Sequence, residues 1–170
     1  GRTGKLFAYE HEEIKPDMIT VGKALSGGFY PISAVLSSRE ILGVFKPGEH
    51  GSTFGGSPLA AAVGMAALDV IVDEKLAERS RELGEYFISK LKTLKTPIIK
   101  EVRGIGLFNC IELTNPDDWQ KALIYCFEEG IITGTHLFNV GCLSIKPPLI
   151  ITEQKIEESI EKILKALDRL

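Results

Sequence analysis

Short runs of β-branched and aliphatic residues alternate with helix-forming segments along the whole chain. This alternation constrains the fold more than any other feature of the sequence. Strands separated by helices are typical of α/β proteins, and they argue against an all-helical or an all-β fold. The predicted strands are 18–21, 32–36, 98–102, 107–113 and 143–145.

Two helices in the first half are predicted from their starting residues. Ser57 precedes Pro58, which places a capping hydroxyl before a proline at the first helical position. The Ala-rich run 59–72 that follows predicts a largely buried helix. Ser37 with Glu40 three residues later forms a capping box, which predicts a short second helix.

Three helices are predicted in the second half. In the segment 74–94, apolar residues recur at helical spacing between charged residues, which predicts an amphipathic surface helix. Asn115 followed by Pro116 repeats the cap-and-proline signal. Thr152 then opens the last amphipathic helix.

Composition excludes several classes of protein. The 170 residues carry 20 Lys and Arg against 23 Asp and Glu, and the net charge of −3 gives no counter-charge for nucleic acid. Cys110, Cys126 and Cys142 lie far apart and are too few for a disulfide framework. No run reaches the about 18 apolar residues of a membrane helix. No metal site is predicted.

Lys23 is the first candidate for a catalytic residue. It follows the apolar run 18–21 directly and precedes the glycine pair 27–28. A buried strand end would strip water from the lysine and favour the neutral amine that Schiff-base chemistry needs. The alternative is a solvated loop lysine, and position alone does not decide between them.

Two nucleotide-binding motifs are excluded at the glycine-rich positions. A phosphate-binding P-loop ending at Gly22 requires glycine where Asp17 stands, and Ser or Thr where Ala24 stands. The Gly-x-Gly segment 104–106 lacks the third glycine of a dinucleotide fingerprint, because Asn109 occupies that position. We predict a tight turn between two strands there.

The loop 46–57 is the second candidate for a functional segment. It combines His50, Ser52 and Thr53 with several glycines, directly before the capped helix at Ser57. Glycines allow backbone amides to approach an anion, and hydroxyls donate hydrogen bonds to phosphate oxygens. The alternative is a flexible surface turn.

Read together, these segments resemble the class III pyridoxal-phosphate-dependent aminotransferase family in both order and spacing. Two further segments, 30–35 and 46–50, resemble the branch of that family that acts on ornithine more than the branch that acts on acetylornithine. The resemblance covers nearly the whole chain. It rests on residues 1–5, 15–17, 22–28, 50–56, 101–107 and 147–149.

The resemblance implies a fold. Residues 1–72 would belong to the large, mixed and mostly parallel sheet domain of a fold-type I enzyme, residues 73–95 to a connecting helix, and residues 96–170 to a small C-terminal α/β domain. Family members are much longer than this chain. We therefore expect a part of an enzyme that is inactive alone, with a cytoplasmic location, or the mitochondrial matrix in a eukaryote.

The resemblance also implies roles for three residues. Lys23 matches the lysine that holds pyridoxal 5'-phosphate covalently and moves a proton during transamination. Thr53 matches the residue that binds the cofactor phosphate of the neighbouring subunit in a homodimer. Ser52 matches a neighbour of cofactor and substrate.

The implied reaction moves the δ-amino group of ornithine to 2-oxoglutarate, giving glutamate semialdehyde and glutamate. One departure bears on the substrate. Where the family carries an arginine that handles substrate carboxylates, this chain has Ser144, which cannot form a bidentate carboxylate pair. Lys146 offers a nearby point charge. Ser57, where relatives usually carry Asn, still caps a helix.

Two alternatives remain open at the level of the sequence. In one, the chemistry is the same but the amino donor is acetylornithine or another ω-amine. In the other, the chain is a non-catalytic module that keeps a dimerisation surface.

Overall fold

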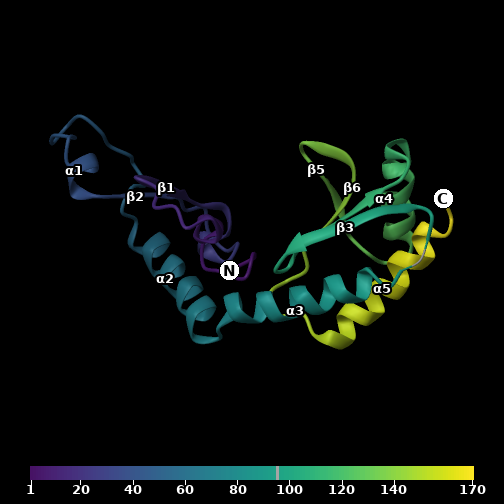
Figure 1. Ribbon diagram of the computed structural model, residues 1–170. Coiled ribbons are helices and arrows are strands. Elements are labelled where there is room, and N and C mark those ends of the chain that lie inside the picture. Colours follow the sequence, from purple (N-terminus) through teal and green to yellow (C-terminus); the bar gives the residue numbers. More distant parts are fainter. Residues whose placement is uncertain (95) are drawn as a thin grey trace. The chain divides into compact units, whose positions relative to one another are not determined.

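The computed structural model describes residues 1–94 and 96–170, which form two compact units (Figure 1). Gly1–Ala8 and Leu76–Leu170 make up one, called here the C-terminal unit, and Tyr9–Lys75 make up the other, called the lysine-bearing unit. Both combine helices with β-sheet, so the predicted α/β class is confirmed. The boundaries at residues 72 and 95 concern domains of a longer protein and stay a prediction.

The lysine-bearing unit is built on one pair of strands. The strands β1 and β2 pair antiparallel, with Val21 opposite Ala34. No parallel pair occurs among the described strands, so the mostly parallel sheet stays an expectation for a longer chain. The elements of this unit are η1 (Ala8–Glu12, which begins at the last residue of the other unit), β1 (Met18–Val21), η2 (Lys23–Ser26), β2 (Ala34–Ser37), α1 (Arg39–Leu42) and α2 (Pro58–Asp73).

The helix α2 begins where predicted, because the Ser57 hydroxyl accepts a hydrogen bond from the Ala60 amide at 3.5 Å. The prediction that this helix is largely buried is wrong for this chain. Only Ala60 and Gly64 are buried, whereas Met65 is 64% exposed. Within the unit, α2 packs mainly on η2, so the other sides of its apolar surface have no cover from the described residues.

The short helix α1 is capped by Ser38, which corrects the prediction of Ser37. The Ser38 hydroxyl accepts a hydrogen bond from the Ile41 amide at 3.3 Å. Ser37 is instead the last residue of β2, paired with Met18, and its hydroxyl donates to the Asp17 carbonyl at 2.5 Å. Strand pairing therefore holds Ser37 and moves the helix start by one residue.

The C-terminal unit has a four-stranded antiparallel sheet in the order β3-β4-β6-β5. The strand β5 was not predicted, because three residues are too few to give an alternating pattern. The elements are α3 (Leu76–Leu91), β3 (Ile99–Ile105), β4 (Phe108–Leu113), η3 (Pro116–Asp118), α4 (Trp119–Glu128), β5 (Gly134–His136), β6 (Asn139–Ile145) and α5 (Glu153–Leu167).

Three helices, α3, α4 and α5, share one hydrophobic core with one face of this sheet (Figure 1). The amphipathic helix predicted over 74–94 is confirmed as α3, and the predicted caps at Asn115 and Thr152 are confirmed by their hydrogen bonds. None of the helices in the described part of the chain combines the length and apolar character needed to cross a bilayer. The fully buried large core residues are Phe87, Leu91, Leu107, Ile111, Leu113, Leu143, Ile156, Ile163, Leu167 and Cys126.

The predicted tight turn between two strands is confirmed, but it lies at Gly106 and Leu107, because Gly104 and Ile105 belong to β3. Gly106 has φ +55°, and a Cβ there would lie 2.6 Å from the Arg2 carbonyl oxygen. A Cβ at Gly84 of α3 would lie 2.1 Å from the Gly106 carbonyl oxygen. The turn is thus enclosed by backbone from α3 and from the N-terminal segment, and neither glycine leaves room for a side chain.

We predict that Gly106→Ala lowers the free energy of unfolding by about 2–5 kcal/mol. A left-handed alanine costs about 1–2 kcal/mol and overpacking against backbone about 1–3 kcal/mol more. Urea unfolding followed by the fluorescence of Trp119, the single tryptophan, measures the change. Gly130→Ala is the matched control, because its φ is +80° but its nearest neighbour is the Lys162 ammonium at 3.6 Å. Equal losses for the two variants would contradict the role of packing.

Candidate active site

Lys23 lies at the turn that follows β1, and it shares a left-handed backbone with two other non-glycine residues of the described chain, Glu13 and Lys75. Its φ of +51° is in the left-handed region that side chains disfavour, which costs about 1–2 kcal/mol. The expected burial is absent in this chain, because β1 alternates between exposed and half-buried residues and Lys23 itself is exposed. Strain of this kind gathers at functional sites, where the surrounding structure maintains it.

The surrounding backbone holds this conformation in place. The helix η2 begins at Lys23, where the Leu25 amide donates to the Gly22 carbonyl at 3.1 Å. Gly27 ends η2 in the left-handed region with φ +65°. The buried Ser26 hydroxyl then accepts a hydrogen bond from the Tyr30 amide at 3.1 Å. The segment on both sides of Lys23 is therefore fixed by local hydrogen bonds.

Lys23 lines a shallow hollow of about 400 Å³ together with Pro31, Ile32 and Ser33. The same three residues line a second hollow of about 550 Å³, to which the glycine-rich loop contributes Ser52. Lys23 and Ser52 thus border adjoining hollows of one chain. Thr53 lines neither of them, and its side chain is exposed.

The glycine-rich loop has internal hydrogen bonds of its own. The Lys46 amide donates to the Glu49 carboxylate at 2.7 Å, and the Gly55 amide donates to the Ser52 carbonyl at 3.1 Å. The His50 ring lies 5.6 Å from the Phe45 ring, measured between centroids. The two hydroxyls at 52 and 53 are exposed at a turn whose backbone is held on both sides.

Ser33 borders both hollows but was not singled out in the sequence. A Cβ placed on Gly22 would lie 3.2 Å from the Ser33 Cβ, so these two residues face each other across the strand pair. The antiparallel register, with Val21 opposite Ala34, brings Ser33 to the turn that carries Lys23. Only a prediction of that register would have found it.

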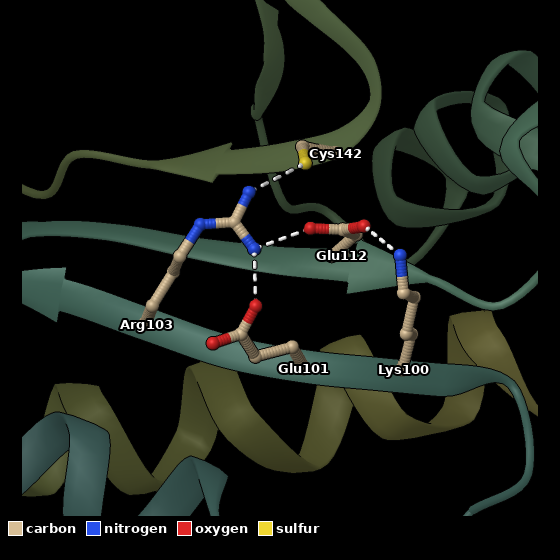
Figure 2. Close-up of polar contacts among 5 residues, drawn as sticks. All are labelled: Lys100, Glu101, Arg103, Glu112 and Cys142. Carbon is tan, nitrogen blue, oxygen red and sulfur yellow. Dashed lines mark hydrogen bonds and ion pairs between the residues drawn. The ribbon is translucent and has the colours of Figure 1, made fainter.

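The C-terminal unit carries a separate polar cluster, on the sheet face opposite the helices (Figure 2). The Arg103 guanidinium pairs with the carboxylates of Glu112 and Glu101, the latter at 2.8 Å, and donates to the Cys142 sulfur at 3.5 Å. Lys100 also contacts the Glu112 carboxylate, at 2.6 Å. Hydrogen bonds from Lys100 and Arg103 hold the pKa of Glu112 below its usual range.

Ser144 lies on the same face, because it is two residues from Cys142 in β6 and side chains two residues apart point to the same side of a sheet. It pairs with Cys110 of β4, and Cys142 pairs with Glu112. Ser144 is buried, and its hydroxyl has no hydrogen-bond partner among the described residues. Lys146, the nearby charge noted in the sequence, is exposed, with its ammonium 5.2 Å from the centre of the Phe108 ring.

His136 is a polar residue of this face that the sequence analysis missed. Its Nε2 atom is buried without a partner in the described part of the chain. Burial, followed by the positive charges of Lys146 and Arg103, lowers the pKa of His136. A histidine in a three-residue strand gives no signal in the sequence that separates it from a surface histidine.

Both units combine helices with β-sheet, which places the chain among the mixed α/β proteins. The family model described as aminotransferase class-III matches residues 1–167. The chain belongs to that family.

Within this family, the chain is similar to ornithine and acetylornithine aminotransferases. The chain is 52% identical to ornithine aminotransferase from Bacillus subtilis (strain 168), over 98% of this chain and 41% of that protein. Among solved structures it resembles ornithine aminotransferase from Toxoplasma gondii ME49 (TM-score 0.89, 41% identity, 99% of this chain and 40% of that one). It also resembles acetylornithine aminotransferase from Elizabethkingia anophelis (TM-score 0.90, 45% identity, 99% of this chain and 45% of that one). The chain spans about two fifths of the length of the curated relatives it matches.

Proposed function

We propose that this chain carries the lysine of a pyridoxal-phosphate-dependent aminotransferase. Family membership supports the reaction class, and the strained turn at Lys23 is the observation that supports the residue. We infer that the complete protein transfers an amino group between a small amino acid and a 2-oxo acid.

The residues present fit the cofactor. Lys23 offers a primary amine beside a hollow, and Ser33 and Ser52 offer hydroxyls around it. Glycines in the loop before Ser57 allow close approach of an anion to the backbone, and phosphate groups are bound by backbone amides and hydroxyls. When bound, pyridoxal phosphate supplies an aldehyde that links to amines and a ring that stabilises negative charge on the adjacent carbon.

The protein's part of the chemistry falls mainly to Lys23. Its amine would hold the cofactor at rest and would move a proton to and from the substrate carbon during the reaction. The backbone strain at Lys23, maintained by the bonds of η2, keeps the amine at one end of β1. Ser52 and Ser33 are proposed to orient groups in the adjoining hollows.

Labelling tests the role of Lys23. We expect the full-length protein with pyridoxal phosphate, after borohydride reduction and peptide mapping, to carry one cofactor at Lys23. Lys23→Ala should lose this label and its visible absorbance. Lys15→Ala, a change at another exposed lysine of the same unit, should keep both. A non-catalytic module would give scattered label or none, and that result would remove the proposal.

For the substrate we propose ornithine with 2-oxoglutarate, because ornithine aminotransferases of several bacteria match at 51–53% identity. Acetylornithine or another ω-amine is the second candidate. Two observations favour this second candidate. One is the likeness to an acetylornithine aminotransferase, and the other is the buried Ser144, which stands where the family carries an arginine.

Substrate competition separates the two candidates. We expect kcat/KM of the full-length protein to be at least about tenfold higher for ornithine than for N-acetylornithine, a difference of about 1.4 kcal/mol. Glutamate, the product formed from 2-oxoglutarate with either donor, is measured with a coupled glutamate dehydrogenase assay. A preference for N-acetylornithine would assign the second function.

We further propose that Thr53 serves the site of a neighbouring subunit in a homodimer. Thr53 is exposed and lines neither hollow beside Lys23 in its own chain, which supports a role in another chain. A hydroxyl bonded to a phosphate contributes roughly 1.5–3 kcal/mol, so its loss should weaken cofactor binding strongly.

Mixing two inactive variants tests this arrangement. We expect Lys23→Ala and Thr53→Val chains, co-expressed, to regain activity, because one site of the mixed dimer then has both an intact lysine and an intact threonine. Each mixed dimer should have about half the specific activity of a wild-type dimer, so a randomly assembled population, in which about half of the dimers are mixed, should recover about a quarter. Without recovery, Thr53 acts within its own chain or not at all.

A further inference from the structure

Cys110 and Cys142 lie on neighbouring strands of the C-terminal sheet, and both are buried. The register pairs Cys110 with Ser144 and Glu112 with Cys142, so the two cysteines are diagonal neighbours on the face away from the helices. The third cysteine, Cys126, lies in α4 within the helix-side core. Only the first two are arranged as a pair.

The two thiols contact one another. Burial, together with a hydrogen bond to Cys142, raises the pKa of Cys110 to about 12. Diagonal neighbours in a sheet have Cα atoms about 7–8 Å apart, slightly beyond the usual span of a disulfide. Joining the two sulfurs therefore requires β4 and β6 to shift, and the same shift must admit peroxide, because Cys142 is fully buried.

The two sulfurs differ in their polar contacts. The Arg103 guanidinium donates a hydrogen bond to the Cys142 sulfur at 3.5 Å, as Figure 2 shows. Ion pairs with Glu101 and Glu112 hold Arg103 in this position. We therefore assign the first reaction with peroxide to Cys142, the sulfur that contacts the guanidinium, and the second to Cys110.

We propose that Cys110 and Cys142 form an oxidation site at which a peroxide converts the two thiols into a disulfide. The Cys142 sulfur attacks one oxygen of hydrogen peroxide, the O–O bond breaks, and sulfenic acid and water form. The Cys110 sulfur then attacks the Cys142 sulfur, the S–O bond breaks, and the Cys110 proton leaves with the hydroxyl as water. Two thiols lose two electrons in total, and one peroxide becomes two waters.

This site does not depend on the proposed aminotransferase activity. Its chemistry belongs to the sheet face of the C-terminal unit, and its readout is covalent. The disulfide would take the Cys142 sulfur away from Arg103 and join β4 to β6. A thiol reductant such as dithiothreitol should reverse it.

The test treats the full-length protein with hydrogen peroxide, alkylates the remaining thiols after unfolding and maps the peptides by mass spectrometry. We expect the Cys110 and Cys142 peptides to appear linked, with the loss of two hydrogen atoms, and Cys126 to remain alkylated. Dithiothreitol should return both thiols. If both cysteines remain alkylated, or if Cys126 is consumed as fast, the proposal is wrong.

Variants distinguish the order of the two steps. In Cys110→Ser, dimedone should label Cys142 as sulfenic acid, whereas Cys142→Ser should give little label at Cys110. Cys126→Ser is the matched control and should leave the linked peptide unchanged. Arg103→Lys should slow the loss of thiols by several-fold. Equal dimedone labelling in the two single variants would overturn the assignment of Cys142 as the first nucleophile.

Discussion

The structure of the C-terminal unit depends on one buried junction between segments far apart in sequence. The Ser80 hydroxyl of α3 donates to the Arg2 carbonyl at 2.6 Å and accepts from the Leu107 amide at 3.1 Å. The Leu107 amide also donates to Arg2, at 3.0 Å. These bonds satisfy polar groups that would be costly to bury alone, and they fit only because Gly84 and Gly106 have no side chains.

That junction orients the sheet whose two faces differ in character. One face shares its core with α3, α4 and α5, and the other carries the ion pairs of Arg103 and the thiol pair at 110 and 142. Side chains two residues apart in a strand lie on the same face, so the strand register alone brings these polar groups together. The lysine-bearing unit differs, because its helix α2 and its two strands keep many apolar side chains exposed in this chain.

The sequence alone was sufficient for the family, the α/β class and most helix starts. Capping hydroxyls and prolines at Ser57, Asn115 and Thr152 act within a few residues, so their effect can be read locally. The motif around Lys23 was equally local. The errors arose where distant pairing decides: Ser38 rather than Ser37 caps α1, because β1 holds Ser37.

The tertiary structure decided what surrounds those motifs. It brought Ser33 beside Gly22, left Thr53 outside the hollows beside Lys23, and placed His136 and Ser144 on the polar face of the sheet. It also left α2 mostly exposed, although its composition predicted burial. Local signals determine which element a segment forms, whereas burial and neighbours depend on contacts between segments far apart in the chain. Residue spacing can show which face of a helix such as α3 is buried, but it does not show which segment covers that face.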